Sequence, residues 1–404
     1  MAFSNRFFSY IVTGTRYGEI VTPLLQSIGE GNNVTFVDAI SLDSAPSQVD
    51  FVWETTRTKA CRDLHKHARV LNRLHNSQIV ESKASFAFLQ LRMDYPHVLQ
   101  TFVASSSAGV GEWVLANWFN DSITTTHRDD WWAVKASRGS CGKDVWIMNA
   151  SNYEDVIRQL PTGDEYVIQK YIMSPLLYKG RKKFHFRCYA FMSADGSAFV
   201  YRNCFINAAS TDFDTNDTTC TKHITNVQVN RRETGYEGQV ICDLATEYPK
   251  QFKGIQQMWH SVVKASNPFI AAQESSLHFE FFGLDVIVDN FGVCWLIEAN
   301  RLPALEVTSD SKRINEELFF NDMMKAMLYI VLRPILPPFQ NSDSAENEHT
   351  IVDTSQWVLV SGTYTSNHED PSNHKPVSVS CSTWKNLLNW RLFTKKEKNN
   401  IVVG

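Results

Sequence analysis

FEFFGLDVIVDNFGVCWLIEAN, residues 279–300, reads as a single β-hairpin and decides the fold of the chain. Two runs of aromatic and β-branched residues flank the turn sequence DNFG at 289–292, which is a strong hairpin signal. A turn centred on the middle two residues of DNFG places Asp285 opposite Leu296. Glu298 then becomes the diagonal neighbour of Asp285, roughly 7–8 Å away between backbones. We therefore expect two acidic side chains close together on a mostly apolar hairpin.

Asp285, Glu298 and Asn300 together offer two carboxylates and an amide oxygen. Glu298 and Asn300 point the same way because side chains alternate along a strand. Long acidic side chains can close the remaining gap onto one cation. Oxygen-only ligands suit magnesium that holds phosphate rather than zinc. The alternative is that the acids lie on a solvated face of the hairpin, because strands often carry exposed Asp and Glu.

The composition bounds the class of protein. A length of 404 residues exceeds what one hydrophobic core usually spans and predicts two or three subdomains. The net charge of −4 gives no bulk attraction to nucleic acid or to an anionic membrane, and we expect no nucleic-acid partner. The eight cysteines form no CxxC pair, which indicates reduced thiols. With no signal-peptide pattern and no apolar segment long enough to span a membrane, we expect a cytoplasmic protein.

Two upstream segments carry basic residues where an anion could bind. In WWAVKASRGSCGKDVWIM, residues 131–148, Lys135 ends a strand and a loop with two glycines offers backbone amides, which predicts a phosphate lid. An ordinary glycine-containing hairpin turn is the alternative. In KGRKKFHFRCYAFM, residues 179–192, Lys183, His185 and Arg187 share one strand face that could bind an anionic ligand. Edge-strand cations that prevent pairing are the alternative there.

Periodicity and turn signals predict further elements along the chain. A helix with a basic stripe is expected over 58–74, a helix capped by Ser82 over 82–93, and a loop over 105–112. An extended segment is expected at 222–230, and helices over 248–265 and 311–332. Beyond 338 the polar composition predicts loosely ordered segments around one added strand, QWVLVSG, followed by an amphipathic helix over 383–393.

Taken in order, these pieces resemble the tubulin–tyrosine ligase domain of the ATP-grasp superfamily. The resemblance covers about residues 50–305 and is carried by Lys135 with its loop, VIQKYIMSPLL, KFHFRCY, HITN, LDVIV and WLIEAN. It implies an α/β chain with the ATP-grasp fold, in which two α+β subdomains clasp ATP behind an α/β N-terminal subdomain. The implied division is 1–82 for the N-terminal subdomain, 83–170 for the central one, 171–338 for the C-terminal one and 339–404 for the linker, added strand and tail.

The resemblance also implies residue roles. The implied magnesium ligands are Asp285, Glu298 and Asn300, and the implied catalytic residues are Lys135, Arg187 and Glu298. The implied ATP-binding residues are Lys83, Lys135, Gln169, Lys170, Tyr171, Ile172, Lys183, His185, Thr225 and Asn226. The residues implied to meet the second substrate are Arg187, Arg202, Asn207 and Arg301.

Two positions depart from the family's pattern. His185 stands where the motif KFDIR has an aspartate, and Asn207, in FINAAS, stands where a motif like VLRTAS has an arginine. An amide cannot supply the bidentate charged clamp of an arginine. Arg301 is expected to supply the missing positive charge.

The resemblance implies an ATP-dependent ligase that joins a carboxylate to an amine through an acyl phosphate. The implied partners are an amino-acid donor and a carboxylate acceptor, which is either a protein tail such as that of tubulin or a small molecule. One alternative is an ATP-grasp phosphotransferase acting on a small molecule. The other is a nucleotide-binding pseudo-enzyme that serves as a scaffold.

Overall fold

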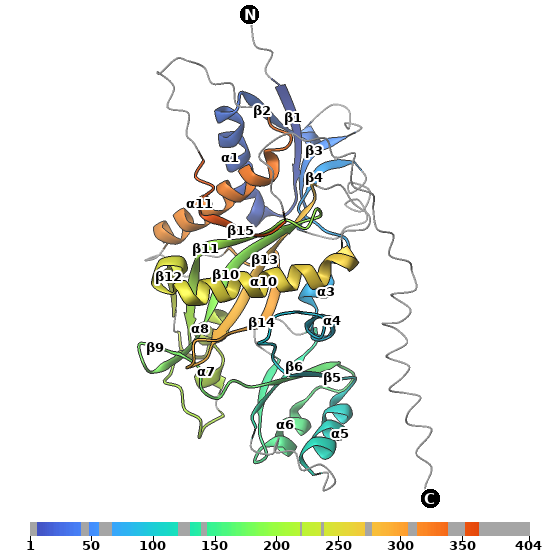
Figure 1. Cartoon of the computed structure of the whole chain (residues 1–404), viewed down its shortest axis with the longest axis vertical. Helices are drawn as coiled ribbons and strands as arrows, with labels where there is room; N and C mark the ends of the chain where they lie inside the picture. The colour runs from blue at the N-terminus through green and yellow to red at the C-terminus, as the bar shows by residue number, and fades with distance from the viewer. Residues whose placement is uncertain are drawn as a thin grey trace, which may run out of the picture.

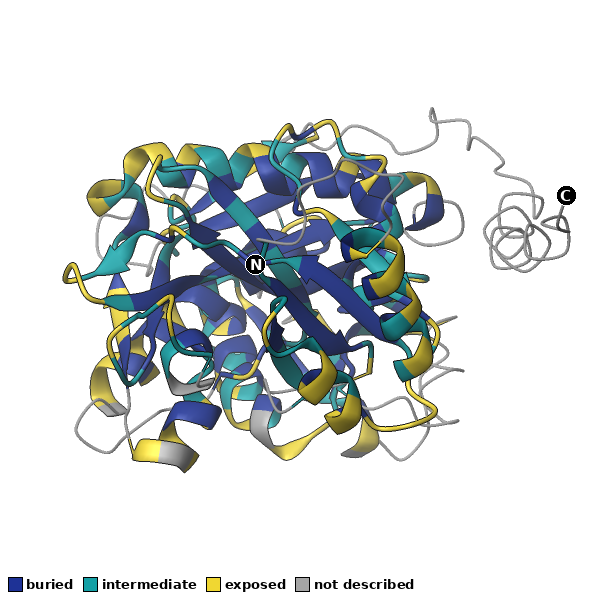
Figure 2. Cartoon of the chain, turned by 90° about the horizontal axis from the view of Figure 1, so that it is seen from below, coloured by how far each residue is buried: buried dark blue, intermediate teal, exposed yellow. Residues whose placement is uncertain are grey.

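Three β-sheets follow one another along the long axis of the molecule, with the N-terminal sheet at the top of Figure 1 and the smallest sheet at the bottom. The computed structural model describes residues 6–41, 48–55, 67–119, 130–138, 144–218, 220–235, 238–270, 277–305, 313–337 and 352–362. Buried strands form the interior and the helices turn exposed faces outward (Figure 2). Two sheets fall within the first two predicted subdomains, whereas the central sheet also takes in a strand at 357–361 from the predicted linker and tail segment; the boundaries remain a prediction.

The N-terminal sheet is parallel and has the strand order β2-β1-β3-β4. Its elements are β1 (Arg6–Val12), α1 (Thr15–Gly31), β2 (Val34–Asp38), the short 3-10 helix η1 (Ala39–Ser41), β3 (Val49–Trp53) and β4 (Ala68–Leu71). The helix expected over 58–74 is therefore wrong from residue 68 onward. Val70 and Leu71 are fully buried as part of β4, and sheet pairing overrides an apolar spacing that also fits a helix. The part of this prediction at 58–66 lies outside the described residues.

The smallest sheet is antiparallel, has the order β5-β8-β6-β7, and is preceded by two short helices. Its elements are α3 (Gln78–Glu81), α4 (Lys83–Gln90), β5 (Thr101–Ala104), α5 (Ser107–Trp118), β6 (Trp132–Ala136), β7 (Val145–Met148), α6 (Tyr153–Gln159) and β8 (Tyr166–Lys170). Ser82 caps α4, as predicted, by accepting from the Ser85 N–H. The loop expected over 105–112 is wrong: α5 starts there, because the Ser106 side chain accepts from the Gly109 N–H as an N-cap.

The central sheet is antiparallel with the order β12-β11-β10-β13-β14, while β9 pairs with β10 and β15 with β11. Its strands are β9 (Leu177–Tyr178), β10 (Lys182–Ser193), β11 (Ala198–Ala208), β12 (Gln239–Cys242), β13 (Phe279–Val288), β14 (Cys294–Arg301) and β15 (Trp357–Ser361). α10 (Pro249–Ile270) covers one face, as Figure 1 shows. On the other face, α1 and α11 (Arg313–Leu332) cover one half and a cavity occupies the rest. The predicted helices at 248–265 and 311–332 and the added strand are confirmed.

The segment 222–230 is helical rather than extended. It holds α7 (Cys220–His223) and α8 (Val227–Thr234), and α9 (Leu244–Glu247) follows β12. The Asn226 side chain accepts from the N–H groups of Gln228 and Val229 and so starts α8. Among the described residues, no helix combines the length and the apolar character that a membrane crossing needs. The amphipathic helix predicted over 383–393 lies outside the described residues.

The hairpin of β13 and β14 differs from the predicted register. Its turn is one residue longer, because Asp289 pairs with Val293 and Gly292 takes the left-handed conformation with φ 85°. A β-bulge then inserts Ile297 between the Val286–Leu296 and Asp285–Glu298 pairs. The two one-residue shifts place Glu298, rather than Leu296, directly opposite Asp285.

Candidate active site

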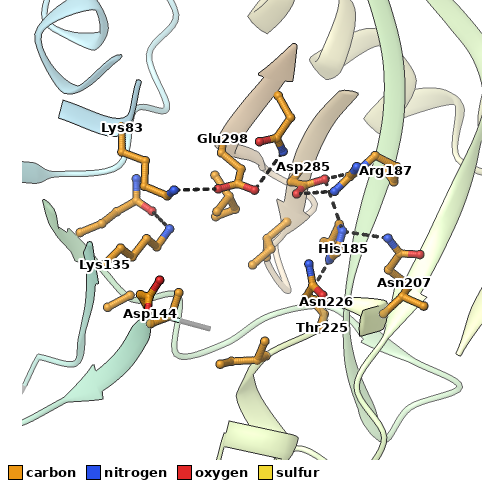
Figure 3. Close-up of a pocket in the computed structure, with 18 of the residues that line it drawn as sticks. Lys83, Lys135, Asp144, His185, Arg187, Asn207, Thr225, Asn226, Asp285 and Glu298 are labelled. Atoms are coloured by element: carbon orange, nitrogen blue, oxygen red, sulfur yellow. Dashed lines mark hydrogen bonds and ion pairs between the residues drawn. The ribbon is translucent and has the colours of Figure 1, made fainter. Parts of the chain in front are cut away.

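A cavity of about 830 Å³ lies between the smallest sheet and the central sheet. Side chains of α4, β6 and β8 line one wall, and those of β10, β11, β13 and β14 line the other. In Figure 3 the lysines Lys83 and Lys135 face the acids Glu298 and Asp285. The cavity therefore brings cations and anions from two sheets to one place.

A charged row crosses three strands of the central sheet in register: Glu298 on β14, Asp285 on β13 and Arg187 on β10. Arg187 donates to both oxygens of Asp285, at 2.5 Å from Nε and 2.9 Å from Nη2. Burial alone would raise the pKa of Asp285, but Arg187 and His185 hold it well below its usual range. Asp285 is therefore an anion at neutral pH, and the bidentate pair fixes its orientation.

The acid pair suits a divalent cation. Asp285 and Glu298 are directly opposite, and paired residues of antiparallel strands lie roughly 4.5–5.5 Å apart between Cα atoms. Asn300 is two residues along β14 and donates from Nδ2 to Glu298 Oε1 at 2.9 Å. No cluster of three His, Cys, Asp or Glu side chains that could hold a metal occurs among the described residues. A cation here would thus use the two acids with Asn300 and ligand oxygens, which is the donor set magnesium prefers with phosphates.

Two lysines face this acid pair from the other wall. Lys83, at the start of α4, has its Nζ 3.9 Å from Glu298 Oε2. Lys135, at the end of β6, is buried and donates to Gln169 Oε1 at 2.7 Å. Burial lowers the pKa of Lys135 to about 8, although Glu298 acts to raise it. An anion bound between these lysines would stabilise the charged form of Lys135, which burial disfavours.

Aromatic side chains form one corner of the cavity around Tyr171. Lys183 Nζ donates to the Tyr171 hydroxyl at 2.7 Å and lies 4.0 Å from the ring centroid. The same hydroxyl bonds His223 Nδ1 at 2.7 Å, and Trp131 packs against both rings. Burial and then the nearby Lys135 lower the pKa of Lys183 to about 7. This aromatic corner is shaped for a flat ring, with a cation at its edge.

A second row, made of polar side chains, runs from β10 toward the sheet edge: His185 on β10, Asn207 on β11 and Gln239 on β12. His185 Nε2 lies 3.1 Å from Asn207 Nδ2 and 3.4 Å from Asp285 Oδ1. Its Nδ1 is 2.6 Å from Thr225 Oγ1. Asn207 Oδ1 is buried and has no hydrogen-bond partner in the part of the chain that the structure describes.

Most of the predicted site residues line this one cavity. They are Lys83, Lys135, Gln169, Lys170, Tyr171, Ile172, Lys183, His185, Arg187, Asn207, Thr225, Asn226, Asp285, Glu298 and Asn300. Of the predicted phosphate lid, Ser137 and Arg138 also line it, whereas 139–143 lie outside the described residues.

Arg301 and Arg202 are the two predicted residues that do not line the cavity. Arg301 binds Glu81 at 2.6 Å and Ser77 at 3.0 Å, because the side chain following Asn300 points to the other face of β14. The expectation that Arg301 supplies the charge missing at Asn207 is therefore wrong. Arg202 lies between β12 and β15, near Thr246 and Asp243.

Several lining residues were not singled out from the sequence. They are Glu81, Asp144, Glu165, Tyr189, His223, Arg231 and Gln239. For His223 a signal existed, because it opens the HITN segment that carries Thr225 and Asn226. For Tyr189 a signal existed as well, because it follows Arg187 by two residues on β10 and so shares its face.

The architecture is that of an ATP-grasp enzyme. The crystal structure of the C-terminal domain of Pby1 from K. lactis, described as an ATP-grasp enzyme interacting with the mRNA decapping enzyme Dcp2, matches with a TM-score of 0.60 at 19% sequence identity. The match covers 88% of this chain and 98% of that domain. The sequence model of the tubulin-tyrosine ligase family matches residues 112–339, more than half of the chain, and the chain belongs to this family.

Curated relatives are distant and longer. Identity is 23% to tubulin glycylase 3E of Tetrahymena thermophila, 25% to the probable tubulin–tyrosine ligase PBY1 of Saccharomyces cerevisiae and 24% to the probable tubulin polyglutamylase TTLL2 of Homo sapiens. These alignments cover 55%, 58% and 67% of this chain. They span only 17%, 38% and 44% of the relatives' own lengths.

Proposed function

We propose that this chain is an ATP-dependent carboxylate–amine ligase that forms an amide bond and releases ADP and phosphate. The observation that carries the proposal is the in-register row Glu298–Asp285–Arg187, which faces Lys83 and Lys135 across the cavity. This arrangement offers a cation site and flanking positive charges where a triphosphate would lie. The family membership and the ATP-grasp fold support the same reaction class.

ATP and Mg²⁺ are the proposed cofactors. Gln169, Lys170, Tyr171 and Ile172 would bind the adenine at the aromatic corner, with Lys183 beside it. His185, Thr225 and Asn226 would lie toward the ribose. Asp285, Glu298 and Asn300 would hold magnesium, which neutralises charge on the β- and γ-phosphates when bound.

The chain's own residues would then balance charge through two displacements. An acceptor carboxylate oxygen attacks the γ-phosphorus, the bond from phosphorus to the ADP oxygen breaks, and an acyl phosphate forms. An amine next attacks the acyl carbon, the carbon–oxygen bond to phosphate breaks, and the amine loses a proton. Arg187, fixed by Asp285, and Lys135 would offset the negative charge on the transferred group. Positioning of both substrates supplies much of the remaining rate.

The acceptor and the donor are proposed at the level of class. The named relatives are described as a tubulin glycylase, a probable tubulin–tyrosine ligase and a probable tubulin polyglutamylase. By analogy we propose an amino-acid-type amine donor and a protein or peptide carboxylate acceptor, of which a tubulin tail is one case. We further propose a cytoplasmic location, on the absence of CxxC pairs among eight cysteines.

The test is magnesium-dependent ADP formation with candidate substrate mixtures. Glu298→Gln should abolish turnover while binding of the ATP analogue AMP-PNP persists, because it removes a cation ligand and keeps the side-chain shape. Glu154→Gln, an exposed residue on α6, is the matched control and should retain full activity. ADP formation with a phosphorylated product and no amide would instead establish a phosphotransferase. Nucleotide binding without turnover in every mixture would establish a pseudo-enzyme.

A further inference from the structure

The floor of the cavity has two cross-strand rows that leave β10 in opposite directions. The charged row runs from Arg187 across β13 to Glu298 on β14. The polar row runs from His185 across β11 to Gln239 on β12, at the edge of the sheet. A triphosphate placed over the charged row leaves the polar row open on the other side of β10. The proposed nucleotide therefore contacts the polar row only at His185.

The polar row consists of an imidazole and two carboxamides, each buried to at least nine-tenths. Neighbouring strands lie roughly 4.8 Å apart, so the row presents polar groups at the spacing of consecutive hydrogen-bonding groups in a ligand. Amides recognise uncharged polar groups by single hydrogen bonds and give no charge to a carboxylate. The unpartnered Asn207 Oδ1 is a carbonyl acceptor, which a carboxylate cannot satisfy.

The cations beside this row already have anionic or aromatic partners. Arg187 makes its two hydrogen bonds to Asp285. Lys183 is held by the hydroxyl and the ring of Tyr171. Arg231, on α8, also lines the cavity, from an exposed position, and the test below separates its role. A carboxylate placed over Asn207 would thus be buried without a charged clamp, which is costly.

We propose that the row His185–Asn207–Gln239 is the floor of the amine-donor subsite, and that it takes an amine flanked by an uncharged amide rather than by a carboxylate. This inference rests on the proposed ligase function. An amino-acid amide or the N-terminal residue of a peptide has this chemistry, whereas a free amino acid does not. Asn207 is the specificity-determining residue, because it lies at the centre of the row and pairs with both neighbours.

The test compares matched amines on the full chain saturated with AMP-PNP and Mg²⁺. Calorimetric titrations with glycinamide and glycine, and with L-tyrosinamide and L-tyrosine, isolate the effect of the flanking group. We expect each amide to bind about tenfold or more tightly than its acid, since a buried carboxylate without a partner carries the larger cost. Equal or tighter binding of the acids overturns the proposal, and so does failure of both members of each pair to bind. Failure of AMP-PNP itself to bind refutes the ligase function instead.

Variants test whether the polar row, rather than another part of the cavity, sets the preference for amides over acids. Asn207→Arg should reverse the preference toward the acids, because guanidinium binds carboxylate bidentately. If that variant fails to fold, the double variant His185→Asp with Asn207→Arg places opposite charges in register across β10 and β11 and should restore folding with the reversed preference. Asn203→Arg, on the same strand outside the cavity, is the control and should leave the preference unchanged. Acid binding in the wild type that is lost in Arg231→Gln overturns the proposal.

Discussion

Arg73 and Glu280 form an ion pair of 2.9 Å with both side chains buried, and it joins the end of the N-terminal sheet to β13 of the central sheet. Glu280 also accepts from Ser77 Oγ at 2.5 Å and lies 3.9 Å from Arg301 Nη1. Burial acts to raise the pKa of Glu280, and Arg73 and Arg301 act to lower it. The carboxylate is thus the centre of a buried network that links two sheets.

Glu280→Ala should lower the free energy of unfolding by about 3–5 kcal/mol, because it leaves Arg73 buried without its anion. Urea denaturation followed by far-UV circular dichroism measures the change. Glu154→Ala, which removes an exposed carboxylate from α6, should change stability by less than about 1 kcal/mol. A loss in Glu280→Ala no larger than in this control would show that the network does not stabilise the junction.

Arg301 connects β14, which carries Glu298 and Asn300, to Glu81 at the end of α3. Ser82 and Lys83 follow at once, so this contact sets where Lys83 stands relative to the acids. Arg301→Gln should weaken AMP-PNP binding about tenfold, because a displaced Lys83 loses a charged phosphate contact. Because Lys83 lies beside Glu298, a proposed magnesium ligand, we expect its phosphate contact at the γ-phosphate, so ADP binding should change little.

Fluorescence titrations with AMP-PNP and ADP measure the two affinities and so the difference between their losses. Arg202→Gln, the same substitution outside the cavity, is the control and should change neither affinity. Equal weakening of ADP and AMP-PNP would contradict a positioning role and indicate general loss of structure.

Nucleotide binding should take up protons at pH 8. Burial lowers the pKa of Lys135 to about 8 and that of Lys183 to about 7, so both are partly or largely neutral there without ligand. A phosphate anion beside Lys135 favours its charged form and raises its pKa, so a proton is bound as the complex forms. The uptake should shrink at pH 6, where both lysines are already protonated.

Calorimetry in buffers of different ionisation enthalpy gives the number of protons taken up. Lys135→Arg keeps a positive charge at every pH and should reduce the uptake at pH 8. Binding heats that do not depend on the buffer at pH 8 would show that the lysines are already charged in the free protein.

The sequence was informative where chemistry depends on neighbours along a strand. The alternation of Lys183, His185 and Arg187 predicted one polar face, and that face lines the cavity. It was uninformative where position depends on pairing between distant segments. Arg301 pairs with Glu81, which lies 220 residues away in the chain. Its guanidinium is therefore bound there and does not approach Asn207. The predicted hairpin register was wrong because neither the longer turn nor the bulge at Ile297 leaves a mark in an alternating pattern.

The same limit applies to the two departures from the family's motifs. His185 and Asn207 are 22 residues apart and looked independent in the sequence. Strand pairing makes them direct neighbours, so they form one coupled change in the cavity floor.

The close approach of Arg187 to Asp285 requires a glycine beneath it. A Cβ on Gly283 would lie 2.8 Å from Pro303 Cβ and 3.3 Å from Arg187 Cδ. Pro303 is itself fixed, because its carbonyl accepts from the Tyr17 hydroxyl at 2.6 Å. Gly283→Ala should therefore displace Arg187 and destabilise the fold by about 1–3 kcal/mol, the usual cost of overpacking. Activity should fall further than stability explains, because the bidentate contact to Asp285 is disturbed.

Gly111→Ala is the matched control, since its Cβ would meet only Ile157 Cδ1 at 3.8 Å on the surface of α5. It should leave activity unchanged and stabilise the helix by up to about 1 kcal/mol, because alanine is the better helix former. Urea denaturation and ADP release, measured on both variants, separate the two effects. If Gly283→Ala matches Gly111→Ala in both, the tight packing under Arg187 does not position it.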